Sequence, residues 1–336
     1  MTGFDVVVVG GGTAGLTAAL AARQEGATVA LVEREERIGG DCTFYGCVPS
    51  KALIEVAQTV HNGAHLHAEG ILDAPPRVSF AAVAARRDRV VAEIAREVRD
   101  ERFAAAGIEV VHGEASFADV RELRVGDRTL HGKRFVIATG SEPVVPPLDG
   151  LDAVPYLTNR TVFSLGELPR RLLVLGGGSV GLELAQAFRR LGSEVAVVEM
   201  ADRLLVREEP EAGEIAHRVL VEEGVELRLG TPASAVRSES SEVVLSLGAA
   251  ELRGDALLVA VGPSIKSGRD RARPTPSGSA SPPATARARG SNTRPKRLRP
   301  STHTRNPGHK SARRATGVNS VIGARGRPRN RLAVPG

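Results

Sequence analysis

The sequence predicts an α/β protein in which two parallel-sheet domains are followed by a basic tail. Three observations lead to this prediction: the length of 336 residues, an internal repeat and an abrupt change of composition. At about 150 residues per domain, the length suits roughly two domains. The contents of 42% apolar and 25% charged residues are ordinary for a soluble globular protein. No stretch of about 18 apolar residues occurs, which excludes a membrane-spanning helix.

The repeat relates residues 6–33 to residues 172–199. The two segments align without a gap and are identical at 14 of 28 positions. Each reads as an apolar strand, a glycine turn, a helix with Ala and Leu at helical spacing, and a second apolar strand that ends in Glu. Near-continuous Val and Leu runs are typical of parallel strands covered on both faces. A chance likeness of two ordinary segments would not repeat these features in register, so we predict two β-α-β units.

The segments around the repeat predict further elements. Residues 80–106 read as one long helix, and residues 108–138 as an antiparallel meander that returns to a buried strand at 135–138. Residues 142–150 suit a crossover between domains. Residues 214–262 supply a helix and several strands.

The predicted domains comprise residues 1–150 and 151–265, and the tail comprises residues 266–336. The tail holds 18 basic residues and one acidic residue, whereas the preceding residues hold 27 basic and 38 acidic ones. With few large aliphatic residues and no aromatic residue, the tail cannot offset its ordering entropy, so we expect it to be disordered. Its Arg/Pro/Ser-rich composition resembles out-of-frame translation of a GC-rich gene. A basic arm that binds nucleic acid is the alternative, but the acidic body suggests no nucleic-acid task.

The cysteine content bears on the cellular compartment. Cys42 and Cys47 are the only cysteines, too few for a secreted fold stapled by disulfides. No signal-peptide pattern precedes the first glycine motif. These observations favour a cytoplasmic protein.

The first glycine motif has the spacing of a dinucleotide-binding turn. Gly10 permits a tight turn, Gly12 lets the backbone approach a pyrophosphate, and Gly15 lets the helix pack closely on the strand. Glu33 follows at the end of the next strand, near the spacing expected for an acid that accepts hydrogen bonds from ribose hydroxyls.

The second motif repeats this pattern with Gly176, Gly178, Gly181 and Glu199. A carboxylate at the strand end favours a free 2′-hydroxyl and repels a 2′-phosphate, which favours NAD over NADP. Arg203, four residues further on, could weaken that preference. Two dinucleotide sites in one chain indicate two dinucleotides, and a flavin with a nicotinamide is the natural pair.

Residues 39–51, GGDCTFYGCVPSK, bring both cysteines into one short segment. A helix that starts at Val48–Pro49 would place Cys47 at the positive end of the helix dipole and lower the pKa of its thiol. Dithiol chemistry needs one sulfur that exchanges with substrate and another that passes electrons onward. Two buried free cysteines or half of a metal site are the alternatives. No metal site is expected, because further cysteine ligands are lacking and the histidines of residues 61–67 suit a solvated helix end.

Residues 39–51 resemble the redox-disulfide motif of the class I pyridine nucleotide-disulfide oxidoreductases. These flavoproteins include lipoamide dehydrogenase, glutathione reductase and mercuric reductase. The resemblance covers residues 4–262 and implies FAD on the first glycine motif and NAD(P) on the second. It implies that Cys42 is the interchange thiol and that Cys47 contacts the flavin. It also implies that Lys51 lies near the flavin N5 and is paired with Glu183.

The same resemblance implies further cofactor-binding positions at the ends of predicted elements. It implies that Gly113 and Ala115 contact the adenine side of FAD. It also implies that Thr139 and Gly140 lie where the chain leaves the FAD domain and that Gly262 closes the NAD domain. Gly40 of the cysteine motif is a further cofactor-binding position.

The chain also departs from the family pattern. Ser179 replaces a tyrosine that covers the flavin in the lipoamide and glutathione enzymes. The family's flavin-ribitol Gly-Asp motif, its His-Glu pair and its dimerisation domain do not follow Gly262. In the family, which is homodimeric, the chain returns after the NAD domain to complete the FAD domain. We therefore expect weakened FAD affinity and an exposed, aggregation-prone apolar edge.

Two functions follow as hypotheses. The first is an oxidoreductase in which electrons pass between NAD(P)H, FAD and a Cys42–Cys47 disulfide, with a small-molecule or protein disulfide or dithiol as substrate. Nucleic acid and membrane are not expected partners. The second is a non-catalytic remnant that only binds NAD and FAD.

Overall fold

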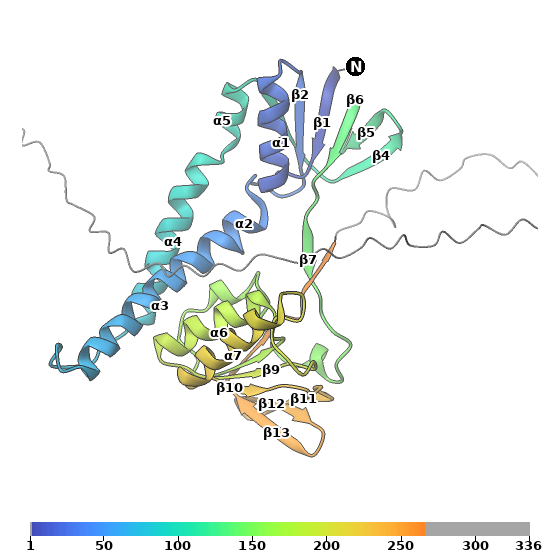
Figure 1. Ribbon diagram of the computed structural model, residues 1–336. Coiled ribbons are helices and arrows are strands. Elements are labelled where there is room, and N and C mark those ends of the chain that lie inside the picture. Colours follow the sequence, from blue (N-terminus) through green and yellow to red (C-terminus); the bar gives the residue numbers. More distant parts are fainter. Residues whose placement is uncertain (1, 266–336) are drawn as a thin grey trace, which may run out of the picture. The chain divides into compact units, whose positions relative to one another are not determined.

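The computed structural model describes residues 2–265, whose backbone is built around two sheets, a mixed one and a parallel one (Figure 1). In the mixed sheet, β3, β2, β1 and β6 pair in parallel, whereas β6, β5 and β4 pair antiparallel. The first sheet has the strand order β3-β2-β1-β6-β5-β4, and the second has the order β10-β9-β8-β14. The strands of the first sheet are β1 (Thr2–Val9), β2 (Val29–Glu33), β3 (Ile108–His112), β4 (Ala115–Asp119), β5 (Glu122–Val125) and β6 (Arg128–Ile137). Those of the second are β8 (Arg171–Leu175), β9 (Glu194–Val198), β10 (Glu226–Arg228) and β14 (Ala256–Val259).

Both copies of the repeat form the predicted β-α-β units. Helix α1 (Thr13–Gln24) joins β1 to β2, and α6 (Ser179–Leu191) joins β8 to β9, with parallel pairing of the strands in each case. Every residue of β2 is buried, as expected for a strand covered on both faces. The predicted α/β fold with two Rossmann-like sheets is confirmed.

The remaining elements connect or flank the sheets. The other helices are α2 (Gly40–Phe44), α3 (Cys47–Ala68), α4 (Phe80–Glu97), α5 (Asp100–Ala105), α7 (Pro210–Glu222) and the 3₁₀ turns η1 (Leu151–Ala153) and η2 (Val162–Ser164). An antiparallel meander contains β11 (Ala235–Glu239), β12 (Glu242–Leu247) and β13 (Ala250–Gly254), and the short β7 (Ser141–Pro143) pairs antiparallel with β15 (Pro263–Ile265).

The second sheet is the middle of three layers. Leu172 and Val174 of β8 pack into one hydrophobic cluster with residues of α6, whereas Leu173 and Leu175 pack into another with residues of the meander. This alternation follows from the period of two along a strand. The sheet is therefore covered on both faces.

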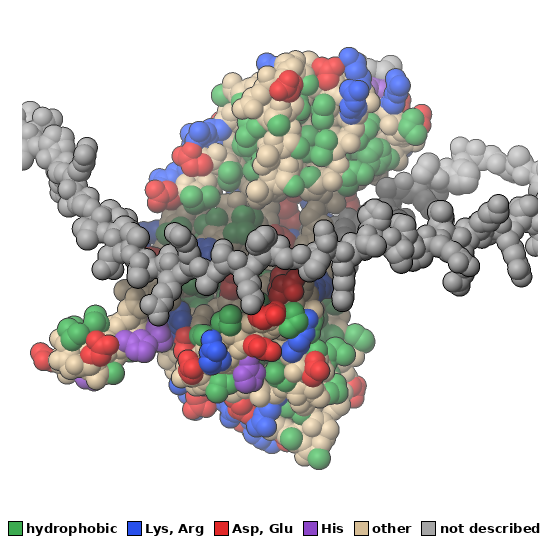
Figure 2. All heavy atoms as spheres, viewed as in Figure 1, with side chains coloured by type: hydrophobic (Ala, Val, Ile, Leu, Met, Phe, Trp, Pro, Cys, Tyr) green, Lys and Arg blue, Asp and Glu red, His purple; other side chains and the backbone are tan. Residues whose placement is uncertain are grey.

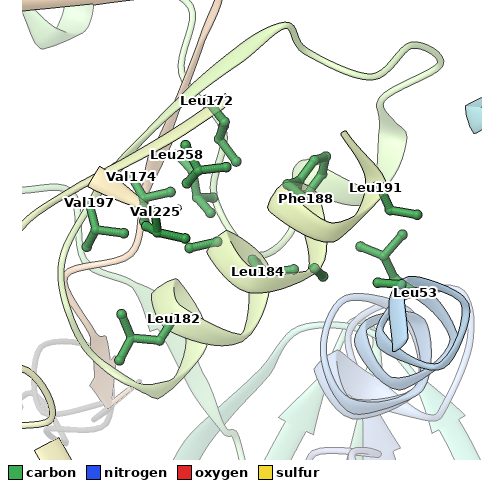
Figure 3. Packing of buried hydrophobic residues seen from close by; sticks show 14 of the residues in the cluster. Leu53, Leu172, Val174, Leu182, Leu184, Phe188, Leu191, Val197, Val225 and Leu258 are labelled. Atoms are coloured by element: carbon green, nitrogen blue, oxygen red, sulfur yellow. The ribbon is translucent and has the colours of Figure 1, made fainter. Parts of the chain in front are cut away.

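Helices α3 and α4 run side by side and share a hydrophobic cluster with α6 (Figure 1). Leu53 of α3 lies in that cluster beside Leu191 of α6 (Figure 3). Phe80 of α4 contacts Phe188 of α6, with ring centroids 6.1 Å apart. Apolar packing therefore fixes the helix that begins at Cys47 against the helix of the second repeat copy.

The prediction of one helix over residues 80–106 is wrong, because the chain leaves the helical conformation at Val98 and Arg99. Arg99 is extended, with φ −90° and ψ 156°, and α5 begins at Asp100. The break lets Phe103 join the apolar cluster beneath the first sheet, while Phe80 joins the cluster around α6. A straight helix could not bury both aromatic rings in two separate clusters, and burial of a large aromatic side chain outweighs the few helical hydrogen bonds that are lost.

The prediction that residues 135–138 form a buried strand is wrong in part. They end β6 and follow it, but Val136 is 36% exposed and Ile137 is 67% exposed. Residues 134–137 pair with β1 on one edge, and β5 pairs only with the start of β6. Figure 2 shows hydrophobic side chains gathered over this part of the first sheet. Val136 and Ile137 point to opposite faces of the sheet, so neither face at the end of β6 is fully covered among residues 2–265, and no other strand of that range pairs with the free edge there.

Two further predictions concern a membrane-spanning helix and the C-terminal tail. Among residues 2–265, no helix is long and apolar enough to cross a membrane. The predicted disordered tail, residues 266–336, lies outside the described residues.

Candidate active site

The two glycine turns have the same backbone geometry. Gly10 and Gly176 have positive φ values of 109° and 114°, and a Cβ at either would collide with the carbonyl oxygen of Ala138 or Ala260. A Cβ at the last glycine of each motif would collide in the same way with the carbonyl oxygen of Gly10 or Gly176. Each turn therefore requires glycine both for its conformation and for close packing of the helix on the strand.

The third glycine of each motif faces open space. A Cβ at Gly178 would meet nothing within 4 Å, and one at Gly12 would first meet Gly40 Cα at 3.8 Å. These residues are the N-caps of α6 and α1, and neither cap carries a side-chain hydrogen bond. The first backbone N–H groups of each helix thus remain free of a side-chain cap at the position where the glycine motif predicts a pyrophosphate.

The acidic residues predicted to bind ribose also hold the turns together. Glu33 accepts hydrogen bonds from the backbone N–H groups of Gly11 at 2.6 Å and Glu35 at 3.0 Å. Glu199 accepts from Gly177 at 2.6 Å and Ala201 at 2.9 Å. A carboxylate has about four acceptor positions, so each residue keeps capacity for ribose hydroxyls. The sequence spacing did not reveal this second role.

The cysteine segment is joined to the first glycine turn through the backbone. The Gly39 N–H donates to the Gly11 carbonyl at 2.7 Å, and Gly39 and Gly12 form a parallel bridge. A Cβ at Gly40 would lie 2.7 Å from Gly12 Cα. In the second turn the corresponding carbonyl, that of Gly177, accepts from Leu205. Of these two carbonyls, only that of the first turn binds the segment that contains the cysteines.

The two cysteines lie on consecutive helices and form a dithiol pair. Half-buried Cys42 lies in α2, and exposed Cys47 is the first residue of α3. A hydrogen bond with Cys42 raises the pKa of the Cys47 thiol, and burial raises it further, whereas the charge of Lys51 lowers it less. The prediction of a lowered pKa for Cys47 is therefore wrong. Helix α3 begins at Cys47 rather than at Val48–Pro49.

Lys51 and Glu183 meet although 132 residues separate them. Lys51 Nζ of α3 donates to Glu183 Oε2 of α6 at 2.7 Å, and both side chains are exposed. They border an open groove of about 190 Å³ between the two helices. Its remaining lining residues are Ile54, Ala57, Gln186, Ala187 and Arg190.

The other predicted cofactor-binding residues lie at strand ends. Gly113 follows β3, and its N–H donates to the Glu33 carbonyl at 2.8 Å. Ala115 begins β4, and Thr139 and Gly140 follow β6. These positions share the edge of the first sheet where β1 leads into the glycine turn, the usual edge for ligands of parallel sheets.

Gly262 stands apart from that group. It follows β14 of the second sheet, and its carbonyl accepts from the Val144 N–H at 2.9 Å. The predicted cofactor-binding residues therefore lie at strand ends of both sheets.

A contact that the sequence did not predict lies beside Cys42. Arg160 Nη2 donates to Asp41 Oδ1 at 2.6 Å, and the Arg160 guanidinium lies 5.4 Å from the centre of the Tyr45 ring. Asp41 and Tyr45 belong to the cysteine motif, but Arg160 is 119 residues away from Asp41. No local pattern in the sequence could have indicated this pairing.

Among residues 2–265, no group of three or more His, Cys, Asp or Glu side chains is placed to hold a metal ion. His61 and His65 lie one turn apart on α3, with their Nε2 atoms 3.0 Å apart. They form a pair without a third such side chain.

Two sheets with matching glycine turns, one of them joined to a dithiol, define a two-nucleotide disulfide oxidoreductase class. Residues 4–272 match the pyridine nucleotide-disulphide oxidoreductase family. The chain belongs to this family, and the predicted resemblance is confirmed.

The similar proteins include mercuric reductases and a flavoprotein. The mercuric reductase of Streptomyces lividans is 40% identical over 271 residues, covering 78% of this chain and 57% of the relative. That of Shigella flexneri is 40% identical over 275 residues, covering 77% of this chain and 48% of the relative. The chain thus spans about half the length of the curated relatives that it matches.

Among solved structures, the Cu(II) complex of the HOCl-induced flavoprotein disulfide reductase RclA from Escherichia coli has a TM-score of 0.71 and 30% identity. It covers 81% of this chain and 60% of that chain. Family members of the mercuric reductase type use FAD and NAD(P)H.

Proposed function

We propose that the chain is an FAD-dependent, NAD(P)H-linked dithiol/disulfide oxidoreductase, with FAD on residues 1–150 and the nicotinamide nucleotide on residues 151–265. The observation that carries this proposal is the backbone junction between Gly39 of the cysteine motif and Gly11 of the first glycine turn. It joins the cysteine motif to the first glycine turn, whereas the equivalent carbonyl of the second turn accepts from Leu205. The site next to the thiols is the one that suits the flavin.

When bound, FAD would take a hydride from NAD(P)H and supply two electrons to a disulfide. The reduced pair is then Cys42 and Cys47 as free thiols, the form that the structure shows. The Cys42 thiolate attacks a substrate disulfide and releases one substrate thiol. Cys47 attacks the mixed disulfide at Cys42, which releases the second thiol and restores the Cys42–Cys47 disulfide. A dithiol substrate runs the same steps in reverse.

The position of Lys51 supports this division between the two thiols. Lys51 follows Cys47 by four residues in α3, so the two lie one helical turn apart, and its charge lowers the pKa of the Cys47 thiol in competition with the stronger effect of Cys42. Glu183 holds the Lys51 ammonium at 2.7 Å. Cys47 is therefore the thiol nearer to a fixed positive charge at the groove between α3 and α6, and we assign electron uptake to it.

The second glycine turn supports NAD as the nicotinamide nucleotide. Glu199 accepts from two backbone N–H groups, which keeps its carboxylate at the end of β9. Arg203 donates to the backbone carbonyls of Leu205, Val206 and Glu208. Because Arg203 is engaged with its own loop, it is not directed to a 2′-phosphate.

The substrate class and partners follow from the same family. A small-molecule or protein disulfide or dithiol fits the thiol pair, and the mercuric reductases among the relatives make a soft metal ion the competing electron acceptor. The cytoplasmic location predicted from the cysteine content stays a prediction.

The test is an anaerobic titration of the purified chain with NADH in the presence of added FAD. We expect the first equivalent of NADH to generate two titratable thiols per chain, because the reduced flavin passes its two electrons to the disulfide, and a second equivalent to bleach the flavin absorbance. The double variant Cys42→Ser/Cys47→Ser should already bleach with the first equivalent and generate no thiols. Thiols that appear equally without NADH would contradict the proposal.

The exposure of Val136 and Ile137 on β6 favours a second candidate, a protein that binds the nucleotides without turnover. In that case NADH binds, which NADH fluorescence or calorimetry detects, but no flavin is bleached. The same titration therefore decides between the two functions.

A further inference from the structure

Arg160 is held in place by the second sheet. It follows Leu157, which forms a parallel bridge with Leu258 of β14 and exchanges hydrogen bonds with Leu257 and Val259 at 2.7 and 2.8 Å. The turn that carries Arg160 is closed by Thr158, whose hydroxyl accepts the Arg160 N–H at 3.2 Å. The backbone of Arg160 is thus fixed by contacts independent of its side chain.

The Arg160 side chain reaches the cysteine motif at two points. It donates to Asp41 at 2.6 Å, and its guanidinium lies over the Tyr45 ring at 5.4 Å. The Arg160 and Asp41 side chains are only 28% and 34% exposed. Arg160 Nε is buried and has no hydrogen-bond partner within the described part of the chain. Asp41 is therefore the ionic contact that holds this guanidinium.

The pairing also balances charge next to a redox thiol. Asp41 directly precedes Cys42 in α2, and an unpaired carboxylate in this partly buried helix would disfavour a negative charge on the neighbouring sulfur. An unpaired guanidinium has the opposite effect. With both present, the pair carries no net charge, and it ties α2 to the turn after Leu157.

We propose that Arg160 is a positioning residue for α2, the helix that carries Cys42. Arg160 holds α2 through Asp41 and neutralises the carboxylate beside Cys42. This inference rests on the proposed function, since it concerns the same thiol pair. It requires no cofactor, however, because thiolate reactivity is a property of the reduced chain alone.

The experiment measures the rate of Cys42 alkylation by iodoacetamide in the reduced full-length chain at fixed pH, with the site mapped by mass spectrometry. Arg160→Met leaves the Asp41 carboxylate unpaired, and we expect alkylation about threefold slower than in the unaltered chain. Asp41→Asn leaves the guanidinium unpaired, and we expect alkylation about threefold faster. The double variant should return close to the original rate, and Arg160→Lys should restore most of it.

The matched control is Arg171→Met. Arg171 forms an ion pair of similar burial with Glu226 at 2.8 Å, but in the second sheet. Arg171→Met should leave the rate of Cys42 alkylation unchanged. Circular dichroism shows whether each variant has the same secondary structure as the unaltered chain.

Opposite shifts in the two single variants support the proposal, because loosening of the loop alone would move both rates in one direction. Shifts of the same sign, or no shift, would overturn it. If Arg160→Met does not fold, Asp41→Asn and Arg160→Lys still decide, since an unchanged or slower rate in Asp41→Asn also overturns it. A chain that passes this test but generates no thiols with NADH would refute the proposed function while leaving the role of Arg160 intact.

Discussion

The two sheets place equivalent residues in very different surroundings. Val9 of β1 pairs with Ile137 of β6, and the equivalent Leu175 of β8 pairs with Val259 of β14. Ile137 is 67% exposed, whereas Val259 is 1% exposed. The second sheet is thus complete within the described residues, and the first is not. A repeated sequence pattern specifies the strand, turn and helix of each copy, but it does not specify what covers the strand beside them.

The glycine turns, in contrast, are alike, and matched substitutions test that likeness. Gly15→Val and Gly181→Val each add a side chain where a Cβ collides with a backbone carbonyl. We expect each to lower the free energy of unfolding by about 3 kcal/mol. The first should abolish FAD binding, and the second NADH binding.

Denaturant unfolding and nucleotide titration measure both effects. Loss of both nucleotides in both variants would show that the two sites are not independent. Gly166→Ala, where a Cβ meets nothing within 4 Å and the backbone has no positive φ, is the control for the loss of a glycine.

The contrast between Ile137 and Val259 leads to a second matched pair. Val259→Thr buries a hydroxyl in the apolar cluster beneath the meander, and we expect it to lower the free energy of unfolding by about 2 kcal/mol. Ile137→Thr should change it by less than about 0.5 kcal/mol. It should also reduce self-association, because it removes apolar surface from an unpaired strand.

Chemical denaturation and light scattering of the two variants give these values. Equal destabilisation would mean that β6 is covered in solution by a part of the molecule outside residues 2–265.

Glu199 offers a test of nucleotide choice in the second turn alone. Replacing it by Gln and its exposed neighbour Met200 by Arg removes a negative charge and adds a positive one near the ribose. We expect the ratio of NADPH to NADH affinity to rise by about tenfold, or about 1.4 kcal/mol. Calorimetric titration with both nucleotides measures it. A ratio that does not move would remove Glu199 from the nucleotide site.

The smallest expected effect concerns a histidine near the first turn. His112 lies 2.6 Å from both Asp100 Oδ2 and the Glu35 carbonyl. Burial lowers the pKa of His112, but the hydrogen bonds to Asp100 and Glu35 outweigh it, so the pKa is raised above its ordinary value of 6.5. The ion pair therefore stabilises the fold fully below pH 6.5, and this contribution is lost as the pH rises through the raised pKa.

We expect His112→Gln to lower the free energy of unfolding by less than about 1 kcal/mol at pH 6, because the pair is partly exposed. The difference from the unaltered chain should vanish in alkaline solution. Denaturation across the pH range measures it, and a difference that grows with pH would contradict the assignment.

The sequence predicted most of what is local and little of what is distant. The β-α-β units, both glycine turns and the cysteine motif follow from periodicity and short spacings, which act over a few turns of chain. The break at Val98 and Arg99 depends on where Phe80 and Phe103 are buried, and that is a tertiary property. The pairing of Arg160 with Asp41 spans 119 residues, so no window of sequence contains it. The pKa of the Cys47 thiol is raised rather than lowered because the Cys42 thiol forms a hydrogen bond with it, and a position at a helix start does not reveal that contact.

The pairing of β7 with β15 has a consequence for how the chain could be divided. The Val144 N–H donates to the Gly262 carbonyl at 2.9 Å, directly after β7 and directly before β15. The stretch 144–262, which includes the whole second sheet and its meander, therefore begins and ends at one hydrogen bond. Such a stretch is a modular insertion: its adjoining ends allow it to be excised, transplanted into another host, or circularly permuted without stretching the backbone.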